Sequence, residues 1–169
     1  MTVLTIPASS YYTAGAHWVN PANMYAEDGV FAENNLDRYD NDATTLCFYQ
    51  FDASAIPYGS ALNSLNVFLK YKASLSSPTI APSLRTRAGV TLIENKGMPA
   101  TTTTLTTRQW TEVTSTIAQI TNAGYNIQVG AYYGAAGANI VYFDALWLVV
   151  DYTPPAAVGG FLSLRKGLW

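Results

Sequence analysis

The sequence predicts an all-β fold, an antiparallel β-sandwich of jelly-roll type with an extended arm at each end. Three observations favour this fold: several short segments alternate apolar with polar residues, Gly and Pro separate them, and helical periodicity is almost absent. At 169 residues the chain suits one domain of ordinary size. The predicted organisation is an N-terminal arm at 1–15, the jelly-roll sandwich at 16–155 and a C-terminal arm at 156–169.

The most strongly predicted strand runs from 139 to 153, NIVYFDALWLVVDYT. Its β-branched and aromatic residues disfavour a helix, and it is shorter than the roughly 20 apolar residues of a membrane span. A half-exposed antiparallel strand should alternate apolar with polar residues. We therefore expect a second subunit or a docking surface to cover its second face, because both alternating sets are apolar: Ile140, Tyr142, Leu146, Leu148, Val150 and Tyr152 on one side, and Val141, Phe143, Ala145, Trp147 and Val149 on the other.

Period-two alternation predicts further strands, and turn-forming residues separate them. The clearest examples are 65–72, with its odd-numbered residues facing inward, and 125–133. Residues 115–124, STIAQITNAG, form the predicted helical turn, with a Ser cap, two Ile three positions apart and a terminal Gly. The remaining predicted strands are 44–51, 84–92, 101–107 and 110–114, and the predicted polar loops are 34–42 and 74–82.

Composition and charge narrow the classes of function. Charged residues make up only 12% of the chain, against an average of about 25%. A net charge of −2 without a basic cluster argues against nucleic-acid binding. The first 15 residues lack the cationic head and apolar run of a signal peptide, so we expect a chain made in the cytoplasm, without a membrane span. Cys47 is the only cysteine, and we expect it to be a small buried apolar residue.

The sequence gives little support for catalysis or metal binding. The only histidine, His17, has no flanking motif that supplies a nucleophile and an orienting acid. The acidic residues between 27 and 42 could form an acid/base pair, but their polar loops favour solvated turn residues. We therefore expect no catalytic residue, metal or cofactor, although one group offers the oxygen ligands that calcium prefers: Asp37, Asp40, Asn41 and Asp42.

The abundant aromatic residues leave two interpretations open. The chain has 12 Tyr and 4 Trp. Such side chains on a sheet face stack on sugar rings in jelly-roll carbohydrate-binding modules, and they are also enriched at protein interfaces. Composition alone does not choose between a glycan and a protein partner.

Three stretches resemble a known class of proteins: WVNPANMYAEDGVFA at 18–32, IPYGSAL at 56–62 and YFDALWLVVDYT at 142–153. Together they are similar to β-sandwich structural proteins of tailed-bacteriophage virions. In those proteins a Trp and an Asn-Pro-Asn turn open the domain, an Ile-Pro-x-Gly turn follows, and a Tyr- and Asp-containing strand closes it. The similarity leaves both arms uncovered.

The resemblance implies a non-enzymatic virion protein on the phage head, above all a capsid decoration (cement) protein. It would form a homotrimer and bind the major capsid protein or another virion protein. The alternative is a carbohydrate-binding virion or tail accessory that attaches to host glycans. The candidate subunit interface is Tyr142, Leu146, Trp147, Leu148 and Val149. The candidate capsid-docking residues are Val3, Leu4, Ile6, Phe161, Leu162, Leu164, Arg165, Lys166, Leu168 and Trp169.

Overall fold

Strands dominate the computed structural model, which describes residues 1–13, 18–36, 47–75, 80–88, 91–96, 102–112, 116–121, 125–133 and 139–156. The prediction of an all-β chain is therefore confirmed. In chain order the elements are β1 (Thr2–Thr13), β2 (Trp18–Val19), η1 (Pro21–Tyr25), β3 (Ala32–Leu36), β4 (Cys47–Phe51), β5 (Ala61–Ala73), β6 (Ile80–Ala88), β7 (Thr91–Lys96), β8 (Thr106–Glu112), α1 (Ile117–Thr121), β9 (Tyr125–Tyr133) and β10 (Asn139–Thr153).

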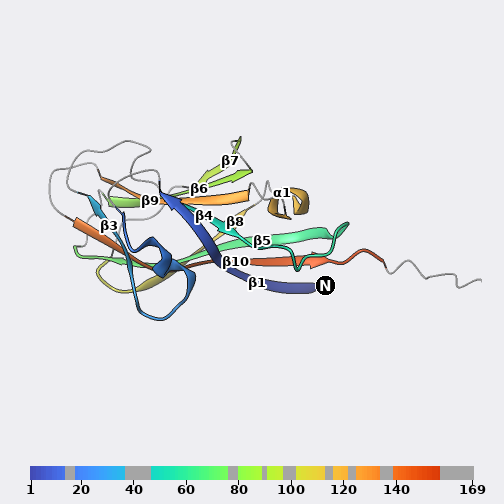
Figure 1. Cartoon of the computed structure of the whole chain (residues 1–169), viewed down its shortest axis with the longest axis horizontal. Helices are drawn as coiled ribbons and strands as arrows, with labels where there is room; N and C mark the ends of the chain where they lie inside the picture. Colours follow the sequence, from blue (N-terminus) through green and yellow to red (C-terminus); the bar gives the residue numbers. More distant parts are fainter. Residues whose placement is uncertain are drawn as a thin grey trace, which may run out of the picture.

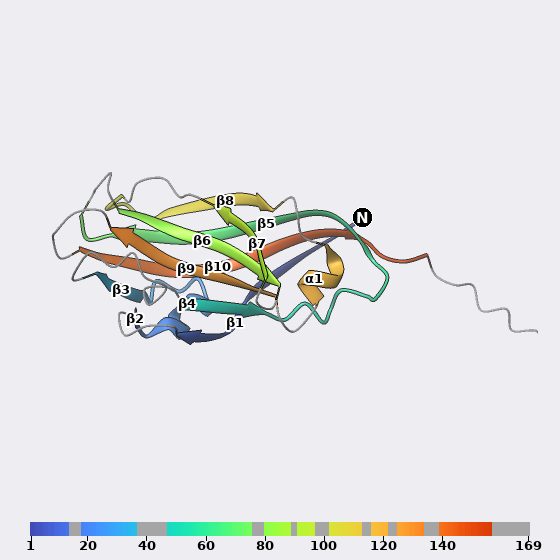
Figure 2. The same ribbon diagram turned by 90° about the horizontal axis from the view of Figure 1, so that it is seen from above.

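The strands form two antiparallel layers with jelly-roll connectivity (Figures 1 and 2). Sheet A has the order β1-β10-β5-β8, and sheet B has the order β4-β9-β6-β7. The first half of β1 pairs with β10 and its second half pairs with β4, so this strand links the two sheets. This order is the jelly-roll arrangement of eight strands in two sheets, and the predicted sandwich is confirmed.

The core lies between the sheets and is built from alternate residues of each strand. The odd-numbered residues of β5 from Leu65 to Tyr71 are buried, as the alternation predicts. The Trp18 ring stacks on Phe143, with 5.2 Å between ring centroids. Burial raises the pKa of Tyr49, whose hydroxyl donates a hydrogen bond to the Pro21 carbonyl at 3.0 Å. The aromatic rings therefore tie the 3-10 turn η1 to the core.

The N-terminal segment, predicted as an arm at 1–15, forms strand β1 of the sandwich. It alternates in exposure: Ile6 and Ala8 are buried, whereas Val3 is 63% exposed. Leu4 packs against the core. Ile6 is therefore unavailable for docking, and Val3 keeps an outward side chain. The rest of the predicted docking set, from Phe161 to Trp169, lies outside the described residues.

Four other segments differ from the prediction because strand pairing overrides local composition. Residues 84–92 are divided between β6 and β7, which pair with each other on either side of Gly89. β6 begins at Ile80, inside the predicted Ser/Pro loop, because it pairs with β9 from that residue onward. The predicted strands at 101–107 and 110–114 are replaced by β8, and β3 enters the predicted polar loop, where Asn34 is buried.

The predicted helical turn is present as α1, which is shorter than 115–124. Thr116 precedes it and forms a capping box with Gln119. The Thr116 hydroxyl accepts a hydrogen bond from the Gln119 amide at 3.3 Å, and the Gln119 side chain accepts one from the Thr116 amide at 2.7 Å. Ile117 and Ile120 are buried, as their spacing predicts.

The burial of Cys47 gives a direct test of the core. Its side chain is fully buried, and burial raises the pKa of the thiol to about 12. Because the thiolate is the reactive form, we expect a disulfide reagent to leave the native protein unmodified at mildly alkaline pH. The same reagent should titrate one thiol per chain after denaturation. Rapid modification of the native protein, measured by absorbance, would contradict this core.

Candidate functional site

A β-bulge at Asp144 divides β10 into two parts. Phe143 lies opposite Tyr71 and Ala145 lies opposite Lys70, so Asp144 is an extra residue in the ladder. The extra residue moves the inward positions from odd to even numbers. The buried face therefore consists of Val141 and Phe143 before the bulge, and Leu146, Leu148, Val150 and Tyr152 after it.

Because of the bulge, even-numbered and odd-numbered residues of β10 do not form the two separate faces that the sequence predicts. Leu146 is 1% exposed and Leu148 is fully buried, and both belong to the chain's own core. Of the five predicted subunit-interface residues, Tyr142, Trp147 and Val149 are partly exposed on the outer face of sheet A. For these three side chains the subunit interface stays a prediction.

The edge of β10 that faces β1 and β3 has a gap at the bulge. β3 pairs with β10 as far as Phe143, and β1 pairs with it from Pro7 opposite Trp147. Pro7 has no N–H to extend the ladder, and β1 then crosses to β4. Among the described strands, none pairs with this side of β10 from Asp144 to Leu146. The segment that follows η1 lies beside the gap.

The Asp144 carboxylate anchors that segment. Its Oδ1 atom accepts a hydrogen bond from the Gly29 amide at 2.9 Å. Gly29 has a φ of 79°, which glycine adopts without strain. The Oδ2 atom of Asp144 lies 3.1 Å from the Lys70 ammonium nitrogen, which also pairs with Glu27. Asp144 is fully buried, and this arrangement provides the opposite charge and the hydrogen bond that a buried carboxylate needs.

The ammonium group of Lys70 stays charged at neutral pH. The Glu27 carboxylate, and then that of Asp144, raise the pKa of Lys70 above its ordinary value. A raised folded-state pKa means that Lys70 contributes stability below its unfolded pKa and loses it only as the pH rises through the folded value. Burial raises the pKa of Tyr25, so its hydroxyl also remains protonated at neutral pH.

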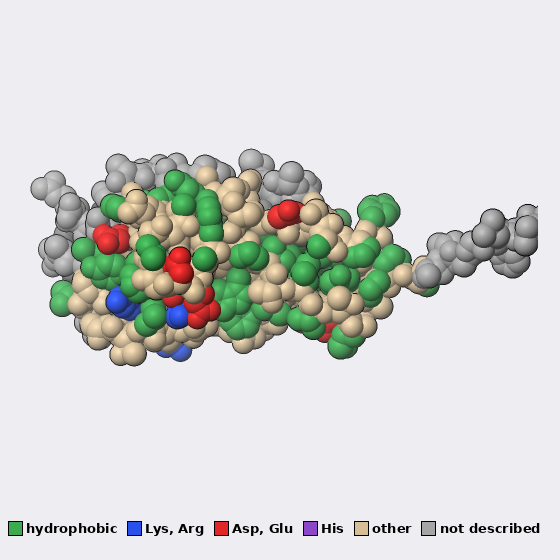
Figure 3. Space-filling model, turned by 60° about the horizontal axis from the view of Figure 1, so that its bottom comes forward, with side chains coloured by type: hydrophobic (Ala, Val, Ile, Leu, Met, Phe, Trp, Pro, Cys, Tyr) green, Lys and Arg blue, Asp and Glu red, His purple; other side chains and the backbone are tan. Residues whose placement is uncertain are grey.

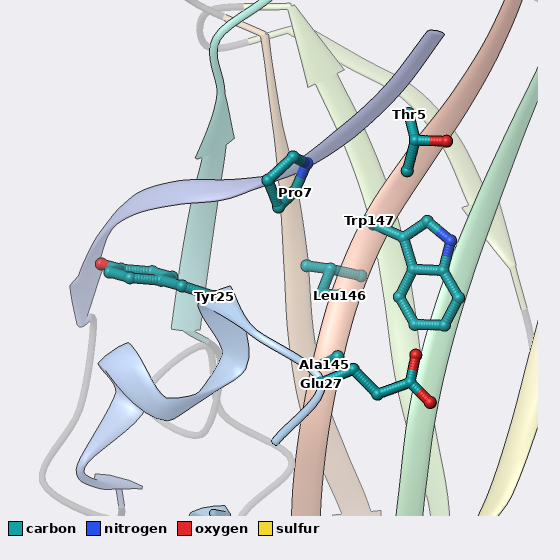
Figure 4. A pocket seen from close by; sticks show the side chains of 7 residues that line it. All are labelled: Thr5, Pro7, Tyr25, Glu27, Ala145, Leu146 and Trp147. Atoms are coloured by element: carbon teal, nitrogen blue, oxygen red, sulfur yellow. The ribbon is translucent and has the colours of Figure 1, made fainter. Parts of the chain in front are cut away.

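A pocket of about 310 Å³ opens beside the gap (Figure 4). Its volume is at the lower end of the range of small-molecule sites, about 300–1,000 Å³. The Glu27 carboxylate points toward the Trp147 ring (Figure 4). The walls come from β1, the end of η1 with the segment after it, and the three residues of β10 that follow the bulge. The lining residues are Thr5, Pro7, Tyr25, Glu27, Ala145, Leu146 and Trp147.

Trp147 belongs to an aromatic pair on the outer face of sheet A. It lies opposite Phe68 in the β10–β5 ladder, and the two rings stack with 5.3 Å between centroids and 6° between planes. Both side chains are partly exposed. Beside them, Asn66 accepts hydrogen bonds from the side chains of Gln109 and Thr111, at 3.1 and 3.0 Å. The face thus combines a parallel aromatic platform with fixed polar groups.

A second aromatic cluster lies on the same outer face, on the other side of the bulge. Phe31 meets Tyr142 edge to face, with 5.8 Å between ring centroids. The Lys72 ammonium nitrogen lies 4.4 Å from the Phe31 centroid and 5.6 Å from the Tyr142 centroid, which are cation–π distances. Figure 3 shows charged side chains grouped beside a band of hydrophobic ones on this side of the molecule.

The structure does not test the other chemical sites that the sequence suggests. His17 and the predicted calcium ligands Asp37, Asp40, Asn41 and Asp42 lie outside the described residues. Within the described part of the chain, no three His, Cys, Asp or Glu side chains are grouped to hold a metal ion. No helix in that part is both long and apolar enough to cross a membrane.

The sequence suggests an acid/base pair or a solvated turn for Glu27 and a structural role for Asp144, and it does not indicate a role for Phe68. The signal for Phe68 was present, because it is the one large apolar residue at an outward position of 65–72. The partner across the sheet, Trp147, cannot be inferred without the strand order.

Comparison with known proteins gives only distant structural matches. No family model and no curated protein matches the chain. Among solved structures, TmCBM61, determined in complex with beta-1,4-galactotriose, has a TM-score of 0.40 and 11% identity, covering 88% of each chain. The Stig cyclase Fisc from Fischerella sp. TAU has a TM-score of 0.41 and 11% identity, covering 89% of this chain and 98% of the other. Values this low leave the ligand to be inferred from this chain's own residues.

Replacing Asp144 tests the anchor at the bulge. Asp144→Ala leaves the Gly29 amide and one side of Lys70 without a partner, so we expect the free energy of unfolding to fall by about 2–4 kcal/mol. Glu27→Gln is the matched control, because the Glu27 side chain is 55% exposed and should cost less than about 1 kcal/mol. Urea denaturation measures both. Equal losses for the two variants would show that Asp144 is not the anchor.

Proposed function

We propose that this chain is a non-catalytic carbohydrate-binding domain whose site is the outer face of sheet A around Trp147. The partly exposed pair of Trp147 and Phe68 carries the proposal. Its rings are nearly parallel, 6° apart, and they give this outer face exposed aromatic surface beside fixed polar groups. The C–H bonds on the face of a sugar ring complement such a surface, since the face of an aromatic ring is electron-rich.

The groups around this platform supply the directional contacts that a sugar requires. Ligand sites commonly join an apolar surface to a few positioned polar groups. Thr5 and Glu27 border the pocket beside Trp147, and the Gln109–Asn66 pair lies on the neighbouring strands. Hydroxyl and carboxylate oxygens accept hydrogen bonds from sugar hydroxyls, and the Gln109 amide and the Thr5 hydroxyl can donate them.

The rigidity of the site favours binding with little ordering cost. Trp147 and Phe68 lie on the two long strands β10 and β5, which pair along twelve positions. Glu27 is held by Lys70, which is held in turn by the buried Asp144. Preformed groups lose less conformational entropy when a ligand binds. The proposal assigns these residues to recognition and assigns none of them to a reaction.

The virion setting is retained as a prediction from sequence. A glycan-binding domain suits a virion or tail accessory that attaches to host glycans, which the sequence offered as its alternative. The capsid decoration role, the trimer and the location on the phage head rest on the resemblance. A subunit interface and an open glycan site would compete for this outer face, because Trp147 belongs to both candidate sets.

Replacing Trp147 tests the proposed site. Trp147→Ala removes the larger ring of the platform, so we expect about a tenfold or greater loss of affinity for an oligosaccharide that the wild-type chain binds on a glycan array. Isothermal titration calorimetry measures the change.

Tyr58→Ala is the matched control, because Tyr58 is fully exposed on the turn before β5 and does not line the pocket. It should bind as the wild-type chain does. The proposal fails if no glycan on a broad array binds the wild-type chain, or if Trp147→Ala leaves the affinity unchanged while its melting temperature shows an intact fold.

A further inference from the structure

We infer that the sugar recognised at this site carries an N-acetyl group, and that the pocket beside Trp147 receives its acetamido substituent. This inference rests on the proposed function and specifies the class of ligand. The sugar ring stacks on Trp147, and the acetamido group enters the gap between β1 and β3. Three features of the pocket favour this substituent over a plain hydroxyl or a carboxylate.

The first feature is the apolar lining. Of the seven lining residues, only Thr5, Tyr25, Glu27 and the indole N–H of Trp147 offer polar side-chain atoms. Pro7, Ala145 and Leu146 provide only carbon atoms to the pocket from their side chains. A hydroxyl placed among these carbons would lose hydrogen bonds to water, whereas a methyl group is stabilised there.

The second feature is the incomplete ladder of β10. Among the described strands, none pairs with Asp144 to Leu146 on the β1 and β3 side of β10, and Ala145 and Leu146 line the pocket. A strand edge presents peptide N–H and C=O groups that bind another amide. An acetamido group carries an N–H donor and a C=O acceptor, as a peptide bond does. It can therefore pair with a strand edge as another strand would, whereas a hydroxyl offers its donor and acceptor on a single oxygen atom.

The third feature is charge. The carboxylate of Glu27 is 55% exposed at the pocket, and the carboxylate of Asp144 is buried behind it. The one ammonium group between them, that of Lys70, contacts both carboxylates. The pocket is therefore net acidic in its immediate surroundings and should repel uronic and sialic acids. A neutral amide N–H can instead donate to Glu27.

A matched pair of trisaccharides tests the inference. Chitotriose and cellotriose share the same ring configuration and linkage, and they differ in carrying acetamido groups or hydroxyls. We expect calorimetry on the full chain to give at least about tenfold tighter binding of chitotriose, equivalent to about 1.4 kcal/mol. Trigalacturonate should bind no more tightly than cellotriose.

A variant locates the preference in the pocket. Ala145→Val adds methyl groups to the wall that the acetamido group would touch and leaves Trp147 in place. We expect it to reduce the ratio of chitotriose to cellotriose affinity, while cellotriose binding persists. Thr5→Val is a second variant at an exposed position and preserves side-chain shape if Ala145→Val does not fold.

The outcomes separate this inference from the proposed function. Equal affinity for the two trisaccharides, or preference for trigalacturonate, overturns the N-acetyl assignment. If Trp147→Ala then still abolishes that binding, the carbohydrate site stands. An unchanged ratio in both folded pocket variants also overturns the assignment. Absence of binding to every glycan on a broad array overturns both.

Discussion

The buried carboxylate of Asp144 is the constraint on which the outer face of sheet A depends. It occupies the extra position of a β-bulge, and leaving it uncompensated would cost several kcal/mol. The Gly29 amide and the Lys70 ammonium compensate it. Because Lys70 also holds Glu27, one buried charge fixes the segment after η1 against the strand. A bulge often re-aims side chains next to a functional site, and here it does so for Trp147.

The bulge and the crossing of β1 together create the pocket. The extra residue turns Trp147 outward and Leu146 inward, while β1 leaves β10 after Pro7 to reach sheet B. If β1 and β3 together paired with the whole length of β10, this side of the strand would have no gap. The pocket therefore follows from the way the jelly roll joins its two sheets, and its lining is mainly apolar because it is continuous with the core at Leu146.

The sequence predicted the fold class and several strands well, because period-two alternation is a local signal. It placed 125–133 at the observed bounds of β9 and gave the inward residues of 65–72 correctly. The candidate site was harder to predict from the sequence. Alternation assumes regular pleating, so the bulge at Asp144 put Leu146 and Leu148 in a candidate interface although they are buried. The contact of Trp147 with Phe68 joins residues 79 positions apart and requires knowledge of strand order. The pairing of the N-terminal strand β1 could not be predicted, because Pro7 and the small residues after it weaken its alternation.

A heteronuclear NMR titration of the full chain with chitotriose tests the central claim most directly. The claim predicts that the largest shifts occur at the Trp147 indole N–H and at the Gly29 amide, while amides of β6 and β9 in sheet B stay unchanged. Shifts concentrated on sheet B, or none at Trp147 at saturating sugar, would contradict the assignment of the site to the face that Asp144 organises.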